Sequence, residues 1–182
     1  MKLETRIILL FIVSVLSGCS AAGVFYSKDP TRKLQQAYAL EAQGRPIPAE
    51  RLAKESLAIY KEKKDIFGQS EAHAFLGSFY KSKSSWKNTN TDKYLSKALE
   101  HFNLSTNRFL SLGENIQASK AYFGLGQTQG LLQRVDLACK NFHKSLSLIE
   151  SGKGKDKEFI ILNPEYGTAA DIYKSNIEAH CK

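Results

Sequence analysis

The sequence predicts an all-α fold in which pairs of helices repeat along the chain. No stretch shows the strict alternation of apolar and polar residues that predicts a half-buried strand. Three segments instead share one helical pattern, and they begin at Ala49, Ala98 and Ala138. Glycine also occurs inside helical patterns, at Gly77 and Gly126. It costs about 1 kcal/mol there relative to alanine, and therefore indicates close contact between helices.

The N-terminal residues have the three-part layout of an export signal. Two basic residues precede an apolar run of about ten residues, and small residues then lead to Cys19. A ten-residue helix covers about 15 Å, whereas the hydrocarbon core of a bilayer is roughly 30 Å thick. The run is therefore too short to span a membrane, and we expect residues 1–18 to be removed as a signal peptide.

The quartet LSGC at residues 16–19 resembles the lipobox of bacterial lipoproteins. This resemblance implies that Cys19 becomes the first mature residue and carries acyl chains, which anchor the chain because each buried methylene contributes about 0.8 kcal/mol. Ser20, not aspartate, follows the cysteine, and in enteric-type bacteria this resembles lipoproteins that are forwarded to the outer membrane, where we expect the chain at the periplasmic face. The alternative is an ordinary secretory signal in which Cys19 is incidental or forms a disulfide.

The mature chain has the length of one domain and a positive net charge. Residues 19–29 lack periodicity and are expected to form the lipidated N-terminus and a short tether. Without the leader's Lys2, Arg6 and Glu4, the 26 basic and 18 acidic residues become 24 and 17, a net charge of +7. This charge favours an anionic lipid, a cell-wall polymer or an acidic partner surface, whereas nucleic acid belongs to another compartment. The length suits one domain with one core.

Helix-capping signals mark the first predicted helix pair. Asp29 followed by Pro30 combines an N-cap residue with proline at the first helical position, and Gly44 ends that helix. Pro46 and Pro48 mark the turn and the start of the second helix.

The second and third pairs follow one pattern at a fixed spacing. Ala98 and Ala138 are 40 residues apart, as are Phe102 and Phe142. The pattern resembles the tetratricopeptide repeat in its longer variety of about 40 residues. The resemblance implies a right-handed α-α superhelix, a solenoid of about three helix pairs over residues 30–160. Each pair leaves an apolar face uncovered, so neighbouring pairs must stack and form a concave side.

The two glycines of this pattern have predicted packing partners. We expect Gly77 and Gly126 to face small residues of the partner helix, with Phe102 and Phe142 filling the space beside them.

The second repeat carries about nine extra residues between its helices. The segment KSKSSWKNTNTDK (81–93) predicts a protruding polar loop that contains the only tryptophan, Trp86. Trp86 is a candidate contact for a partner or a membrane interface. The alternative is that it folds back over the repeat and shields apolar surface.

Residues 161–182 are predicted to form a C-terminal capping helix that covers the open end of the stack. Asn163 and Pro164 have the residue types of a cap and a first turn. If this helix runs antiparallel to the helix that holds Cys139, then Cys139 and Cys181 come close enough to bond, and an exported domain permits a disulfide. The alternative is two unpaired thiols, one of them buried.

No constellation of residues predicts catalysis, a metal or a cofactor. The four histidines show no metal-type pairing, and although Cys139 and His143 lie four residues apart, no further ligands complete a zinc site. The stretch GLGQTQG (124–130) lacks the spacing and the preceding strand of a dinucleotide site, and no G-x-S-x-G motif occurs. We therefore expect no enzyme and no small-molecule substrate.

Function is accordingly expected to come from a binding surface. Proteins with this repeat commonly hold an extended peptide or a helix against the concave face that the first helices of the pairs form. On this basis the predicted partner-binding residues are Tyr38, Glu41, Glu71, Ser78, Lys81, Trp86, Lys120, Phe123 and Gln127. The resemblances together imply a lipid-anchored adaptor at the bacterial outer membrane that binds another envelope protein, similar to pilotins and secretion-associated lipoproteins. The alternative is a structural or cell-wall-binding lipoprotein that acts through its basic surface.

Overall fold

The computed structural model describes residues 27–87, 89–152 and 167–181, and within these ranges the chain forms helices and no strand. The prediction of an all-α fold is confirmed at this level. The helices are α2 (Pro30–Ala42), α3 (Pro46–Glu62), α4 (Ile66–Lys83), α5 (Thr91–Ser111), α6 (Asn115–Leu131), α7 (Val135–Ser151) and α8 (Ala169–His180).

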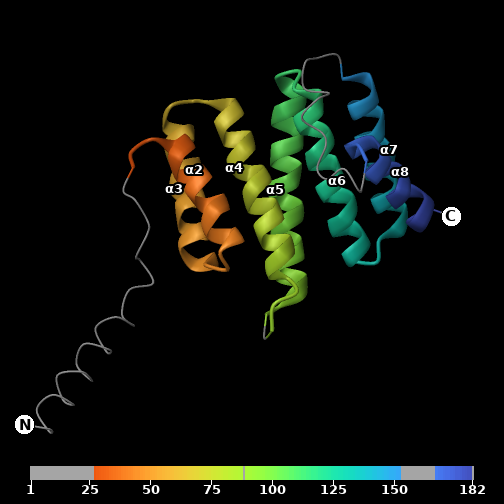
Figure 1. Cartoon of the computed structure of the whole chain (residues 1–182), viewed down its shortest axis with the longest axis horizontal. Coiled ribbons are helices and arrows are strands. Elements are labelled where there is room, and N and C mark those ends of the chain that lie inside the picture. Colours follow the sequence, from red (N-terminus) through yellow and green to blue (C-terminus); the bar gives the residue numbers. More distant parts are fainter. Residues whose placement is uncertain (1–26, 88, 153–166, 182) are drawn as a thin grey trace, which may run out of the picture.

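The helices succeed one another across the molecule from α2 and α3 at one end to α7 and α8 at the other, as Figure 1 shows. Each helix packs chiefly against the helices before and after it, and the closest pairs are α2 with α3, α4 with α5, and α6 with α7. Contacts also join α2 to α4 and α4 to α6, whereas α8 packs against α7. Alternate helices of the series therefore share one side of the molecule.

The first helix begins and ends where the sequence predicts. The Asp29 side chain accepts a hydrogen bond from the Thr31 backbone nitrogen at 3.0 Å, which satisfies one of the free N–H groups of the first turn. After the helix, Gly44 has a φ of 69°, a left-handed conformation that favours glycine.

Phe102 of α5 holds three helices together. It is only 4% exposed, and a Cβ atom added to Gly77 of α4 would lie 2.8 Å from its ring. A Cβ atom on Gly124 of α6 would lie 2.5 Å from the same ring. Phe142 of α7 has the corresponding close contact with Gly126 of α6. The predicted close contacts of Gly77 and Gly126 are confirmed, and the contact of Gly124 is an addition.

The segment between α4 and α5 is shorter than the predicted loop. Helix α4 continues to Lys83 and α5 begins at Thr91, so about half of the extra residues lengthen the helices and the others lengthen the connection between them. Trp86 packs edge-on against Phe79, with ring centroids 5.9 Å apart, and lies partly buried against the core. The tryptophan therefore folds back over the repeat.

The last helix begins later than predicted. Thr168 is its N-cap and forms a capping box with Asp171, while Gly167 just before it has a φ of 73°. Asn163 and Pro164 therefore do not start α8, and they lie outside the described residues.

Helix α8 covers the end of the helix series. Tyr173 of α8 stacks on Phe123 of α6 with ring centroids 4.5 Å apart. The structure contains a disulfide between Cys139 of α7 and Cys181, with Cα atoms 5.5 Å apart. This bond joins the end of α8 to the preceding helix.

The predicted signal peptide, residues 1–18, and the predicted lipidation site Cys19 lie outside the described residues. Within the described ranges, no helix is both long and apolar enough to cross a bilayer.

Candidate partner-binding groove

Three adjoining cavities lie along the helices α2, α4, α6 and α8. The α2 cavity has a volume of about 260 Å³, the central cavity about 240 Å³ and the α8 cavity about 510 Å³. Tyr38 and Glu71 line both the α2 and the central cavities, and Lys81 and Gln127 line both the central and the α8 cavities. Because neighbouring cavities share lining residues, we treat the three as one groove.

Seven of the nine residues that the sequence singled out line this groove. They are Tyr38, Glu71, Ser78, Lys81, Lys120, Phe123 and Gln127. Glu41 lies one turn beyond Tyr38 on α2, and its charge acts on the Tyr38 hydroxyl. Trp86 does not line the groove, because it packs against Phe79. The apolar floor from α5, Phe102 and Phe109, was not predicted as part of the groove.

Lys81 stands at the junction of the central and α8 cavities. Its ammonium group donates a hydrogen bond to the Gln127 side-chain oxygen. Within the ranges that the structure describes, no carboxylate lies within ion-pair distance of it. Burial lowers the pKa of Lys81, and no acid among these residues counteracts this effect. The described part of the groove thus holds a partly buried cation whose hydrogen-bond partner is neutral.

The part of the groove near α2 is acidic. Burial raises the pKa of Glu71, although the Lys120 charge partly opposes this, and burial also raises the pKa of Glu41. The pKa of Tyr38 is raised by burial and then by the negative charges of these two residues. The Tyr38 ring packs edge-on against Phe75 with centroids 4.6 Å apart, which fixes its position.

The α8 cavity has both apolar and polar side chains in its lining. Leu131 and Val135 line it and remain 58% and 52% exposed, respectively, so the cavity borders exposed apolar surface. Phe142 also lines this cavity, and Asn176 and His180 of α8 contribute polar groups to its lining.

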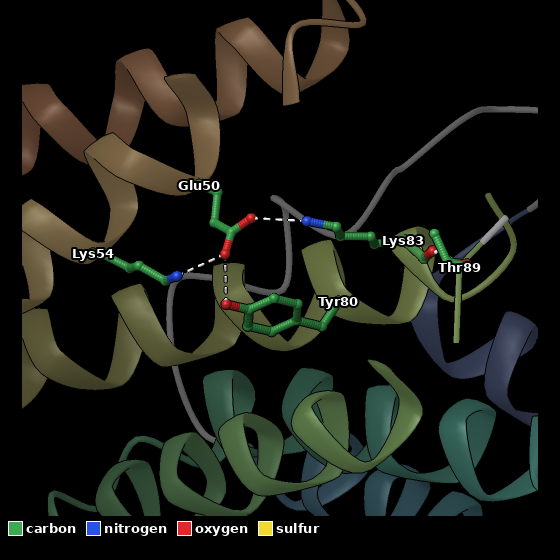
Figure 2. A network of polar contacts seen from close by, with 5 residues as sticks. All are labelled: Glu50, Lys54, Tyr80, Lys83 and Thr89. Carbon is green, nitrogen blue, oxygen red and sulfur yellow. Dashed lines mark hydrogen bonds and ion pairs between the residues drawn. The ribbon is translucent and has the colours of Figure 1, made fainter. Parts of the chain in front are cut away.

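A separate polar cluster joins the first helix pair to the second (Figure 2). Tyr80 of α4 donates a hydrogen bond to Glu50 of α3 at 2.8 Å, and Lys83 donates to the other carboxylate oxygen at 3.0 Å. Lys54 donates to Glu50 at 2.6 Å, and Thr89 bonds to the Lys83 backbone oxygen at 3.2 Å. Burial opposes ionisation of Glu50, but the three side-chain hydrogen bonds outweigh it and lower its pKa to about 2. Because three side chains of the protein already bind this carboxylate, we interpret the cluster as structural.

Two histidines meet between α4 and α5. The Nδ1 atoms of His73 and His101 lie 2.8 Å apart, so one ring donates a hydrogen bond and the other accepts it. His73 is only 3% exposed, and its Nε2 atom is buried without a partner among the described residues. Burial is the largest cause that lowers the pKa of His73 to about 3, and His101, Arg108 and Lys61 contribute. Burial also lowers the pKa of His101. Within the described ranges, no group of three or more potential metal ligands gathers here or elsewhere.

This histidine pair predicts acid lability. His73 has a pKa of about 3 in the folded state against 6.5 ordinarily, so the unfolded state binds more protons between these values. The stabilising contribution is therefore present above pH 6.5 and is lost as the pH falls toward 3. We expect the contribution of His73 to the free energy of unfolding to fall by about 2–3 kcal/mol when the pH is lowered from 7 to about 4.5. Chemical denaturation at both pH values measures this loss.

The control for this prediction is the double variant His73→Leu/His101→Leu. It removes both imidazoles and leaves the carboxylates that also titrate in this range. If its stability fell with pH as steeply as that of the unchanged protein, the histidine pair would not be the cause.

Comparison with models of known protein families finds no match for this chain, and comparison with curated proteins finds none either.

Proposed function

We propose that this chain is a lipid-anchored adaptor of the tetratricopeptide type at the periplasmic face of a bacterial outer membrane. It holds an extended segment of another envelope protein in the groove and aids the placement or assembly of that protein. The observation that carries the proposal is the convergence of seven predicted residues, from three separate helices, on one groove. The proposal involves no catalysis and no cofactor.

The repeat architecture in this proposal is a right-handed superhelix of three helix pairs closed by α8. Two features support it. The pattern residues recur at a spacing of 40 residues, as from Phe102 to Phe142, and each of these rings packs against a glycine of the preceding helix. Contacts between α2 and α4 and between α4 and α6 place the first helices of successive pairs side by side, as stacking of such repeats requires.

The membrane anchor in this proposal is the acylated Cys19. Its support is the LSGC quartet after a short apolar run. The described residues begin only eight positions after Cys19, and a chain of eight residues reaches at most about 29 Å. An anchored groove would therefore stay close to the membrane surface and meet partners there.

Site-specific crosslinking tests the proposal. A photoreactive amino acid in place of Ser78, which is exposed and lines the groove, is expected to capture one envelope protein in native membranes. The same probe in place of Lys93, an exposed residue at the start of α5 outside the groove, is the matched control and is expected to capture none of it. The Lys120→Glu substitution should abolish the crosslinked complex that forms from the probe at position 78, because it reverses a charge in the groove. Equal capture from both positions would contradict the groove as binding site.

A second candidate function is supported by a basic stripe on α7. Lys140, His143 and Lys144 line a cavity of about 480 Å³ together with Tyr122, Asn141 and Ser147, and none of the described acidic residues lines it. This surface suits an anionic polymer or lipid headgroup, as in the cell-wall-binding alternative. The crosslinking experiment distinguishes the two when it is repeated at high salt. Binding through the exposed lysines should be lost, because salt screens exposed charges, whereas a groove complex should persist.

A further inference from the structure

The geometry points to a ligand segment in which a carboxylate pairs with Lys81, an adjacent apolar side chain fills the α8 cavity, and a basic group lies on the side of Glu71. This inference rests on the proposed function and specifies the chemistry of the partner segment.

The carboxylate is inferred from the surroundings of the other buried lysines in this chain. Lys33 and Lys83 are also largely buried, and each meets a carboxylate: Lys33 pairs with Glu55 at 2.5 Å, and Lys83 with Glu50 at 3.0 Å. Such pairing is the rule, because an ammonium group removed from water without a counter-charge is costly. Lys81 lacks a carboxylate partner among the described residues.

The position of Lys81 makes a bound ligand the natural source of the missing charge. Its side chain lines two adjoining cavities, so an anion that enters the groove can reach it. The hydrogen bond to Gln127 orients the ammonium group between α4 and α6. Because the groove walls exclude part of the solvent, a carboxylate there would interact with Lys81 more strongly than with an exposed lysine.

The apolar neighbour follows from the α8 cavity. Its volume of about 510 Å³ accommodates a leucine or phenylalanine side chain, and such a side chain would cover Leu131 and Val135. Since Lys81 also lines this cavity, the apolar side chain and the carboxylate must be close together in the ligand.

The basic group follows from the other side of Lys81. Glu71 and Glu41 lie toward α2, and burial raises the pKa of each. The Lys120 charge partly opposes this at Glu71, but no lysine or arginine among the described residues is within ion-pair distance of either carboxylate. A cation there would favour the ionised form of both. The charges of the groove therefore set an order for the ligand: apolar, acidic, then basic, from α8 toward α2.

Selection from a phage-displayed library of random 12-residue peptides, against the mature full chain, tests this order. We expect enriched peptides to contain an apolar residue beside Asp or Glu and a basic residue further along. Replacing the selected acid by its amide should weaken binding at least tenfold, as should Lys81→Met, which removes the charge and keeps an apolar side chain of similar length.

A matched pair of glutamine substitutions separates binding from structure. Gln127→Glu supplies Lys81 with an internal carboxylate, so it should raise the melting temperature and weaken binding of the selected peptides at least tenfold. Gln117→Glu introduces the same charge elsewhere in the central cavity and should weaken binding much less.

The outcomes that would overturn the inference differ from those that would overturn the proposed function. Peptides that bind the groove with no acidic preference, or that bind the Lys81→Met variant unchanged, would overturn the inference and leave the adaptor function standing. Absence of any enriched sequence would overturn both.

Discussion

Phe102→Ala is expected to lower the free energy of unfolding by about 3–5 kcal/mol, the range for loss of a buried phenylalanine. The ring is 4% exposed and fills the space left by two glycines on two other helices, α4 and α6. The cavity that replaces it would adjoin three helices, and Gly77 and Gly124 have no side chains with which to fill it. Urea denaturation measures the loss. Phe67→Ala, at a position that is 42% exposed, is the matched control and should cost much less.

A second substitution makes this prediction specific. In the unchanged protein, Gly124→Ala should destabilise the fold, because the new Cβ atom would lie 2.5 Å from the Phe102 ring. In the Phe102→Ala background the same change should stabilise it by up to about 1 kcal/mol, because alanine is the better helix former and the space is free. If Gly124→Ala changed the free energy of unfolding in the same direction in both backgrounds, the Phe102 ring and Gly124 would not be coupled.

The contact between Gly77 and Phe102 could be predicted from the sequence, whereas the contact between Gly124 and Phe102 could not. Gly77 and Gly126 occupy equivalent places in the repeat, and the 40-residue period assigns each of them a phenylalanine of the following helix. Gly124 contacts the phenylalanine of the preceding pair instead. That contact depends on how closely successive pairs stack, which a repeat pattern does not specify.

The groove could be predicted as a helix face but not as a charged surface. Glu71, Ser78 and Lys81 share one side of α4, because their spacings of seven and three residues match the helical period. Whether a carboxylate reaches Lys81 depends on residues of other helices. The pairing of His73 with His101, 28 positions apart, likewise requires the register between α4 and α5.

Replacing both Cys139 and Cys181 by alanine is expected to lower the free energy of unfolding by up to about 4 kcal/mol, from loss of a loop constraint of 42 residues in the unfolded chain. The reduced and the substituted protein should unfold alike, and reductant should not affect the substituted one. Thermal unfolding with and without reductant measures the effect, and equal melting temperatures for the oxidised and reduced protein would contradict it.

Loss of the disulfide should loosen α8 more than the other helices, because α8 packs mainly on α7 and the disulfide fixes its C-terminal end. Amide hydrogen exchange in α8 should rise more than in α2, and the stacking of Tyr173 on Phe123 should weaken.

The disulfide should also affect ligand binding in the α8 cavity. Asn176 and His180 of α8 line this cavity, so reduction should weaken the binding of any ligand that uses it. A ligand held only at the α2 end of the groove should be unaffected. The redox dependence of binding therefore reports which end of the groove the partner occupies.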